Sequence, residues 1–279
     1  MIESGMITEM LGAAPVFLLV AVRALAMIET APLLSSESVP QTAKIALAGF
    51  AAYAVFPSAL MYGSVLSFST LSFVFLALGE AIIGIITGFY LTIIFSAFST
   101  AGQFFSLQMG FGASETFDPL SQVENPLMGQ YLNLVAMLIF LVLGGFNTLF
   151  LGGFQRSIES VNVFALIQGR EHVTGMLLAG LSRLFLDAIV ISMPILGTLF
   201  LTSLATGLIS KAAPQINLLS EGFPISITTA FLLLAVTMPF MVEAFGRIID
   251  SGWEAIETLY ARIGEAVSFR ALPVTGGAA

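Results

Sequence analysis

Four ionisable side chains lie inside long apolar stretches of the sequence, at Arg23, Glu80, Arg183 and Asp187. An ionisable group at membrane depth is costly, and it often has a functional role such as proton or ion coupling. Arg183 and Asp187 are four residues apart, so on a helix they share a face and can form an ion pair. For these two we favour local neutralisation, or side chains that extend toward a membrane interface.

Glu80 is more isolated than the other three. The nearest charged residues in the sequence are Lys44 and Glu115, so the partner of Glu80 must come from elsewhere in the fold, from another subunit or from water. Two roles fit this isolation: proton coupling, and a buried carboxylate whose oxygens accept hydrogen bonds.

The sequence offers little for catalysis. It contains no Cys and one His, so thiolate chemistry and multi-His metal sites are excluded within this chain. His172 lies in a polar connector, where we expect a solvated side chain. The motifs of zinc proteases, α/β-hydrolases and nucleotide-binding loops are absent from the sequence. We therefore expect no enzymatic activity, no cofactor and no metal.

The composition indicates an integral membrane protein. Of 279 residues, 57% are hydrophobic and 9% are charged, and the mean hydropathy is +1.00, whereas soluble domains have roughly a quarter charged residues. The net charge is -8, and the sequence contains no basic stripe for nucleic acid. The first ten residues carry two Glu and no Lys or Arg, which does not predict a cleaved signal peptide.

Apolar stretches long enough to form membrane helices predict an all-α membrane protein. They cover residues 10–28, 45–62, 71–98, 131–154, 176–209 and 225–242. Several contain glycine or proline, at Gly79, Gly84, Gly88, Gly144, Gly145, Gly152, Gly153, Pro194, Gly197 and Pro239. For any single glycine, close packing of helices at small residues is the more common role. Taken as a set, these residues favour broken helices and a chain surrounded mainly by other protein, because lipid cannot satisfy the freed backbone groups.

The C-terminal part has a different pattern. From about residue 243 to 267, apolar residues recur every three or four positions with acidic residues on other faces, which predicts an amphipathic helix. Its polar face is acidic, so we expect it to pack on a partner and not on anionic lipid. We assign residues 1–270 to one membrane-embedded helical domain and residues 271–279 to a flexible tail.

The connector at residues 108–119 combines small residues with the bulky apolar Met109, Phe111 and Phe117, and it ends in Asp118-Pro119. Such a segment could close a water-filled path, because apolar constrictions block ions by dewetting. Alternatively, its apolar residues pack on the helices that flank it.

Three signatures, in one order along the chain, resemble the FliR family of export-gate proteins of flagellar type III secretion, which has SctT-like counterparts in injectisomes. The first is residues 23–34 followed by Ser38-Val39-Pro40. The second is residues 109–119. The third is residues 207–217 followed by Gly222-Phe223-Pro224-Ile225. Signature residues include Arg23, Pro32, Pro40, Asp118, Pro119, Pro214, Gln215, Asn217, Gly222, Phe223 and Pro224.

The resemblance implies helical hairpins that assemble with homologous-type subunits into a conical, helically arranged pore for unfolded export substrates in the bacterial inner membrane, at the flagellar basal body. It implies FliP-like and FliQ-like partner subunits, with FlhB-like and FlhA-like proteins joining or acting nearby. It also implies that the central loop is a plug: Met109, Gly110, Phe111, Gly112, Ala113, Ser114, Glu115, Thr116 and Phe117. Family members often carry a His in the fourth stretch, where this sequence has Gly144-Gly145-Phe146, so no role of that His is transferred.

Two other functions remain open at this stage. A secondary transporter of a small solute would suit broken helices and the isolated Glu80, although we find no convincing internal repeat. A structural membrane scaffold without a conducting path would share the composition and the C-terminal helix.

Overall fold

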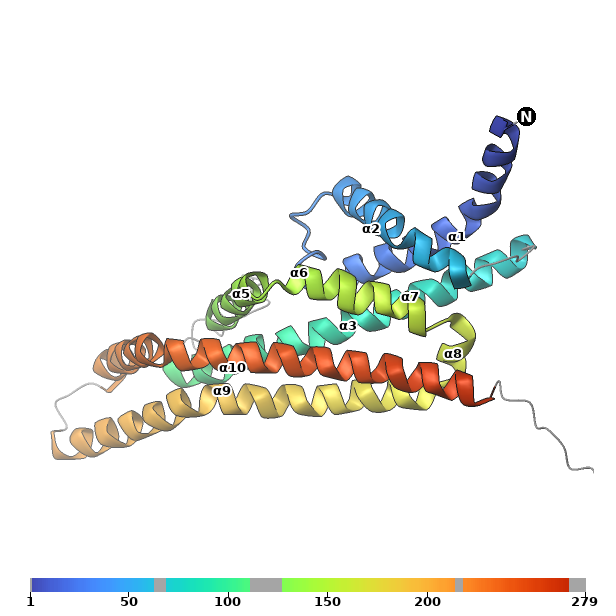
Figure 1. Cartoon of the computed structure of the whole chain (residues 1–279). Coiled ribbons are helices and arrows are strands. Elements are labelled where there is room, and N and C mark those ends of the chain that lie inside the picture. Colours follow the sequence, from blue (N-terminus) through green and yellow to red (C-terminus); the bar gives the residue numbers. More distant parts are fainter. Residues whose placement is uncertain (1, 63–68, 111–126, 214–217, 271–279) are drawn as a thin grey trace, which may run out of the picture. The chain divides into compact units, whose positions relative to one another are not determined.

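A computed structural model describes residues 2–62, 69–110, 127–213 and 218–270, and within these ranges the chain is helical and contains no strand. The elements, labelled in Figure 1, are α1 (Ile2–Thr30), α2 (Gln41–Tyr62), α3 (Thr70–Met109), α5 (Leu127–Val142), α6 (Gly145–Asn147), the π-helix η1 (Thr148–Gln155), α7 (Arg156–Ser160), α8 (Val163–Gln168), α9 (Arg170–Ala212) and α10 (Leu218–Arg270). The predicted all-α class is confirmed.

Among the described residues, five helices are long and apolar enough to cross a membrane. The candidate spans are Ala13–Thr30, Gln41–Ala59, Thr70–Met109, Arg170–Ala212 and Gly222–Gly264. A sixth span results if α5 and the helical segment Gly145–Ser160 are counted together as one broken span. The six predicted apolar stretches therefore correspond to five continuous helices and one interrupted one, and the prediction of an integral membrane protein is confirmed.

The expectation of broken helices is confirmed in one stretch and wrong in the others. The fourth stretch is interrupted at Gly144, whose φ of 75° is a left-handed conformation that glycine adopts readily. In contrast, α3, α9 and α10 run unbroken through their internal glycines and prolines. A single proline removes one helical hydrogen bond, and in these long helices that loss does not end the helix.

The glycines of α3 serve close helix packing instead of interruption. A Cβ atom at Gly84 would overlap the main chain of α1 at Arg23, and a Cβ at Gly88 would overlap Thr30. A Cβ at Gly79 would overlap the side chain of Val163. The missing side chains let α3 approach the backbone of α1, as small residues do in membrane helix pairs. On the α8 side, the space at Gly79 is filled by the side chain of Val163.

The C-terminal amphipathic segment is not a separate helix, because α10 continues from Leu218 to Arg270 (Figure 1). Its apolar face packs on this chain: Trp253 lies against Gly153, and Ile263 lies against Gly169. The expectation that this face packs on a partner is therefore wrong. The predicted flexible tail, residues 271–279, lies outside the described residues.

The chain divides into two compact units. Unit 1 comprises Met1–Thr92, Gly144–Ala179 and Gly252–Ala279, and unit 2 comprises Ile93–Leu143 and Gly180–Ser251. In unit 1, α1 packs on α2, and Phe17 meets Phe56 edge to face with 5.8 Å between ring centroids. The assignment of residues 1–270 to one domain stays a prediction.

Unit 2 is organised around an aromatic cluster and a close helix crossing. Phe95 contacts Phe140 at 5.5 Å between ring centroids, and Phe98 contacts Phe245 at 4.3 Å. The 5.5 Å separation lies within the range of roughly 4.5–7 Å for favourable aromatic pairs, and the 4.3 Å separation lies just below it. Phe98 and Phe245 are fully buried. The crossing brings Gly102 of α3 against Gly129 of α5, so the two helices that flank residues 111–126 are fixed close together.

We predict that Gly102→Ala destabilises the protein by about 1–3 kcal/mol, the usual cost of overpacking. An ideal Cβ at residue 102 lies 2.5 Å from the carbonyl oxygen of Met128 and 2.6 Å from Cα of Gly129, and neither backbone atom can move aside cheaply. The measurement is the thermal unfolding midpoint of the detergent-purified protein. Gly197→Ala is the control, because nothing lies within 4 Å of a Cβ there. Equal midpoints for the two variants would refute the crossing as a tight contact.

Candidate functional site

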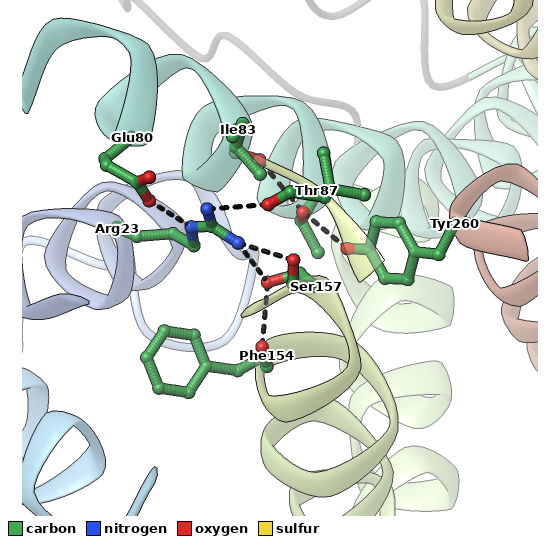
Figure 2. Close-up of polar contacts among 8 residues, drawn as sticks. Arg23, Glu80, Ile83, Thr87, Phe154, Ser157 and Tyr260 are labelled. Carbon is green, nitrogen blue, oxygen red and sulfur yellow. Dashed lines mark hydrogen bonds and ion pairs between the residues drawn. The ribbon is translucent and has the colours of Figure 1, made fainter. Parts of the chain in front are cut away.

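The most extensive polar cluster that the structure describes surrounds Arg23 of α1, whose side chain is 4% exposed. Its Nε donates to Oε2 of Glu80 on α3 at 2.5 Å. Its Nη1 donates to the carbonyl oxygen of Ser157 at 2.6 Å, and Nη2 donates to the carbonyl oxygen of Val161 at 2.9 Å. Figure 2 shows the guanidinium pointing between α3 and the end of α7, where these acceptors converge. We call this cluster the arginine centre.

The arginine centre caps a helix end. Ser157 lies in α7 and Val161 follows its last residue, at the end of the helix where carbonyl groups run short of helical partners. The carbonyl oxygen of Ser157 accepts from the N–H of Val161 at 3.0 Å as well as from Arg23. A cation at a helix C-terminus also compensates the partial negative charge of the helix dipole. Ser157 adds its hydroxyl, which accepts from Nη1 at 3.2 Å and donates to the carbonyl oxygen of Phe154 at 2.7 Å. Arg23 therefore fixes where α7 stops.

The next helix, α8, begins directly after this helix end. Asn162 precedes α8, and its side-chain oxygen accepts from the backbone N–H of Ala165 at 2.7 Å, which is a standard N-cap. Between α7 and α8, Arg23 therefore donates to carbonyl groups at the end of α7, and Asn162 accepts from a backbone N–H at the start of α8. Val163, the first residue of α8, packs on Gly79, one residue before Glu80.

Glu80 pairs with a residue from elsewhere in the fold, which is one of the three sources that the sequence analysis left open. Arg23 is 57 residues away in the sequence, and the carboxylate is 15% exposed. Burying a single charge is expensive unless it is paired and hydrogen-bonded. The geometry favours the interpretation of Glu80 as a buried, hydrogen-bonded carboxylate.

A second buried hydrogen bond follows on the same helix. Thr87 lies two turns after Glu80 on α3, and its hydroxyl is 2.8 Å from the hydroxyl of Tyr260 on α10. Thr87 also donates to the carbonyl oxygen of Ile83 at 2.9 Å, so Tyr260 donates to Thr87. Figure 2 shows this pair beside the arginine centre, with Tyr260 reaching in from α10. The sequence analysis did not identify Thr87, Ser157 or Tyr260, and only the placement of Tyr260 on an apolar helix face gave any signal.

The remaining ionisable residues that the sequence analysis singled out are Arg183, Asp187 and His172. The Arg183–Asp187 pair forms at 3.6 Å on α9, with Arg183 56% exposed, so the prediction of local neutralisation is confirmed. His172 is exposed as expected, although it lies in the first turn of α9 and not in a loop.

The N-terminal signature comprises the last turns of α1 and the connection to α2, and Pro32 and Pro40 lie in that connection. Lys44 of α2, 4% exposed, reaches back to the carboxylate of Glu29 at 3.0 Å and to the carbonyl oxygen of Ser35 at 3.2 Å. Lys44, which follows the signature in the sequence, therefore ties the connection between the two helices to the end of α1 through a nearly buried cation.

The central and C-terminal signatures meet in unit 2. Met109 is fully buried at the end of α3, and Gly110 follows with a φ of 90°. A Cβ at Gly110 would overlap the ring of Phe223, which lies with Gly222 and Pro224 in the first turns of α10. The remaining predicted residues, Phe111, Gly112, Ala113, Ser114, Glu115, Thr116, Phe117, Asp118, Pro119, Pro214, Gln215 and Asn217, lie outside the described residues.

The long apolar helices and their buried ion pair define the class of protein. Within the described ranges, no group of three His, Asp or Glu side chains is placed to hold a metal ion. In unit 1, the charged side chain of Arg23 pairs with Glu80 and binds carbonyl groups at a helix end. Large apolar side chains lie exposed on the outside. The fold is that of a helical membrane protein in which a polar cluster joins α1, α3 and the end of α7.

Comparisons with known proteins agree with this class. A family model described as bacterial export proteins, family 1, matches residues 14–252. The chain is 34% identical over 230 residues to the flagellar biosynthetic protein FliR of Escherichia coli K12, covering 78% of this chain and 82% of that protein. It is 28% identical over 262 residues to FliR of Bacillus subtilis 168, covering 90% and 96%. It is 33% identical over 197 residues to FliR of Borreliella burgdorferi, covering 69% and 73%. The chain belongs to family 1 of the bacterial export proteins, the FliR family.

We predict that Arg23→Met destabilises the protein more than Glu80→Gln. Arg23→Met leaves the carboxylate of Glu80 and the carbonyl oxygen of Val161 without the donors that Arg23 supplies, while the carbonyl oxygen of Ser157 keeps only the N–H of Val161. Breaking a buried ion pair costs about 3–5 kcal/mol. Glu80→Gln keeps an oxygen that accepts from Nε, and the guanidinium keeps its carbonyl acceptors. The measurement is the thermal unfolding midpoint in detergent.

The matched control for this comparison is Arg183→Met. Its ion pair is long and largely exposed, so its loss costs roughly 0–1 kcal/mol. A Glu80→Gln variant that is less stable than Arg23→Met would show that the carbonyl acceptors contribute little.

Proposed function

We propose that this protein is a subunit of the flagellar type III protein-export gate in the bacterial inner membrane, and that it forms part of a pore for unfolded export substrates. The observation that carries this proposal is the family match over residues 14–252, together with relatives named flagellar biosynthetic protein over most of the chain. The chain contributes apolar helices to a wall and no chemical step, so transport through it depends on energy supplied elsewhere in the apparatus.

The surface of α9 supports assembly with other proteins. Within unit 2, exposed large apolar side chains run along α9 from Leu181 to Ile209, which is about 42 Å at 1.5 Å per residue. The hydrocarbon core of a bilayer is ~30 Å thick, and a tilt of roughly 45° would be needed to fit the band, compared with an average of ~20°.

The position of the ion pair on α9 adds to this argument. Arg183 and Asp187 lie near the start of the band, and charges are disfavoured in hydrocarbon. A bilayer placed over residues 189–209 avoids the pair. It then leaves Leu181, Phe185 and Leu186, all exposed, outside lipid, where a protein neighbour would shield them from water. FliP-like and FliQ-like subunits are the proposed neighbours, with FlhB-like and FlhA-like proteins nearby.

The described ends of the central segment suit a plug. On one side Met109 is fully buried, and on the other Met128 is 3% exposed. The crossing of Gly102 with Gly129 holds the two ends close together. A segment with both ends fixed can present apolar side chains at one place, and apolar constrictions exclude ions by dewetting. Residues 109–117 are the proposed plug.

The transporter alternative loses its main support. That alternative relied on an isolated Glu80, and Glu80 is engaged by Arg23. A carrier that used this carboxylate would have to break a buried ion pair in each cycle, at an expected cost of several kcal/mol.

We predict that replacing residues 110–117 by a Gly/Ser linker of equal length opens the resting gate to ions. The linker removes Phe111 and Phe117, so the passage loses its apolar seal. The measurement is potassium flux through membranes that contain the assembled complex, followed with a potential-sensitive dye. The control is the same linker placed in the 271–279 tail. A tight barrier in the linker variant would rule out the plug.

We also predict that the protein, purified in mild detergent, is found in a complex with FliP-like and FliQ-like chains. Exposed apolar side chains outside the bilayer need protein cover, so the isolated chain is expected to be unstable alone. Native mass measurement of the purified complex checks this. A stable monomer with solute-uptake activity would instead support the transporter alternative.

A further inference from the structure

One face of α3 within unit 1 exposes large apolar side chains at a regular spacing. Leu78, Ile82, Ile85 and Phe89 are between 44% and 57% exposed, and they follow one another at steps of four, three and four residues. Phe75 continues the same spacing one step earlier and is also exposed. In the described stretch from Leu78 to Phe89, every other residue is buried or half-buried. We call Leu78, Ile82, Ile85 and Phe89 the α3 seam.

The opposite side of α3 is occupied within unit 1. Glu80 binds Arg23 of α1, and Gly84 packs on the α1 backbone. Thr87 forms a hydrogen bond with Tyr260 of α10. These contacts fix the rotation of α3 about its own axis, so the seam faces outward. A stripe as narrow as this one is typical of a helix that packs on a single other helix.

Charged groups reach the surface of unit 1 near the first end of the seam. Ser157, which accepts from Arg23, lies on α7 between the exposed Arg156 and Glu159 in the sequence. Arg23 in turn binds Glu80 of α3. Surface charges of α7 therefore lie close to the level of Glu80 along α3.

The other end of the seam lies beside the polar connection between α1 and α2. The hydroxyl of Thr92 donates to the carbonyl oxygen of Thr30, the last residue of α1, at 2.7 Å. The connection that follows exposes residues 36–38, which are serine, glutamate and serine. From Glu80 to Thr92, α3 rises about 18 Å at 1.5 Å per residue, whereas the hydrocarbon core of a bilayer is ~30 Å thick.

The short distance between these two polar levels decides what can cover the seam. A bilayer over the seam would also submerge the charges at one of the two levels, and charges are disfavoured in hydrocarbon. Left in water, the seam would be a contiguous apolar stripe, and such stripes mark sites of interaction with other molecules. A protein partner is therefore the occupant that the surroundings of the seam allow.

The positions that flank the seam determine the chemistry of this partner. In a heptad pattern the flanking positions are those where paired helices place ion pairs. Here they carry no charge: Gly79, Ala81, Ile86 and Gly88. A charged side chain brought against the seam would be buried without a counter-charge, which is costly. The contact face of the partner is therefore apolar and uncharged over about three turns of helix.

We propose that the α3 seam is the docking site for one apolar, uncharged helix of a different, neighbouring subunit. Alternating steps of three and four residues favour packing at a crossing angle of about 20°. This inference rests on the proposed export-gate function and deepens it, because it identifies the surface that receives a neighbour and the chemistry of the helix that fits there.

The first test is photocrosslinking in the complete complex in membranes. A benzophenone amino acid is incorporated at position 78, 82, 85 or 89, one position at a time. We expect all four positions to crosslink to one helix of the same partner chain, and the crosslinked peptide to lack charged residues on the side that reacts. Position 258 is the control, because Thr258 is exposed on a polar face of α10 in the same unit, and it is expected to give no crosslink to that peptide.

The second test introduces a charge into the seam. We expect Ile82→Asp to lower the amount of the crosslinked partner that co-purifies with this protein several-fold, because the carboxylate would be buried against an uncharged helix. Ile82→Leu keeps an apolar side chain and is expected to retain the partner. Thr258→Asp is the matched control, since it adds the same charge in unit 1 outside the seam. Equal partner yields for Ile82→Asp and Thr258→Asp would overturn the proposal.

The crosslinking result stands without the charged variant and separates this inference from the proposed function. Adducts with lipid alone, or no adduct, in a complex that still assembles would overturn the docking site and leave the export-gate function in place. Adducts with a second copy of this chain would overturn the assignment to a different subunit. A protein that purifies without any partner chain would contradict the proposed function, and the docking site with it.

Discussion

The structure of unit 1 depends on the burial of one guanidinium group. Arg23 is almost completely removed from solvent, and each of its three nitrogens donates to an acceptor from another part of the chain. A charge in an apolar interior is tolerated when it is paired and its donors are satisfied. Because those acceptors belong to α3 and to the end of α7, the position of three chain segments is determined by one side chain. The planar fork of arginine suits this task, whereas lysine would offer a single point of charge.

The second constraint is the close approach of helices at glycine. In unit 1, Gly84 brings α3 against the backbone of α1 at the level of Arg23, and in unit 2, Gly102 brings α3 against α5. Helices without a hydrophobic driving force between them gain from such close packing. This explains why glycine inside the apolar stretches was a poor indicator of broken helices. The break at Gly144 differs because its φ of 75° lies outside the helical region, and the sequence alone does not distinguish a glycine used for packing from one used for its dihedral angle.

The same reasoning explains which parts of the site the sequence could predict. The Arg183–Asp187 pair is local, and helix periodicity places both residues on one face. The pairing of Arg23 with Glu80 joins positions 57 residues apart, so the sequence could state only that Glu80 needs a partner. Two of the acceptors are backbone carbonyl groups of Ser157 and Val161, and every residue has such a group, so no pattern of residue types marks them. The meeting of Gly110 with Phe223 was hidden for a similar reason, although both residues belong to recognisable signatures.

The distribution of charge has a consequence for assembly. The ionisable residues of the arginine centre are neutralised inside unit 1, and large apolar side chains are left on the outside of α3, α9 and α10. Neighbouring subunits of the proposed gate cannot then be recognised mainly through ion pairs with these buried groups. Recognition must come from shape, and in membrane assemblies shape complementarity is provided by small residues beside large ones. Gly197 of α9, which has open space at its Cβ position, lies in the sequence between the exposed Met193 and Phe200, so this stretch of α9 places a residue without a side chain between two bulky ones. An apolar surface with such relief can specify a neighbour without placing any charge in lipid.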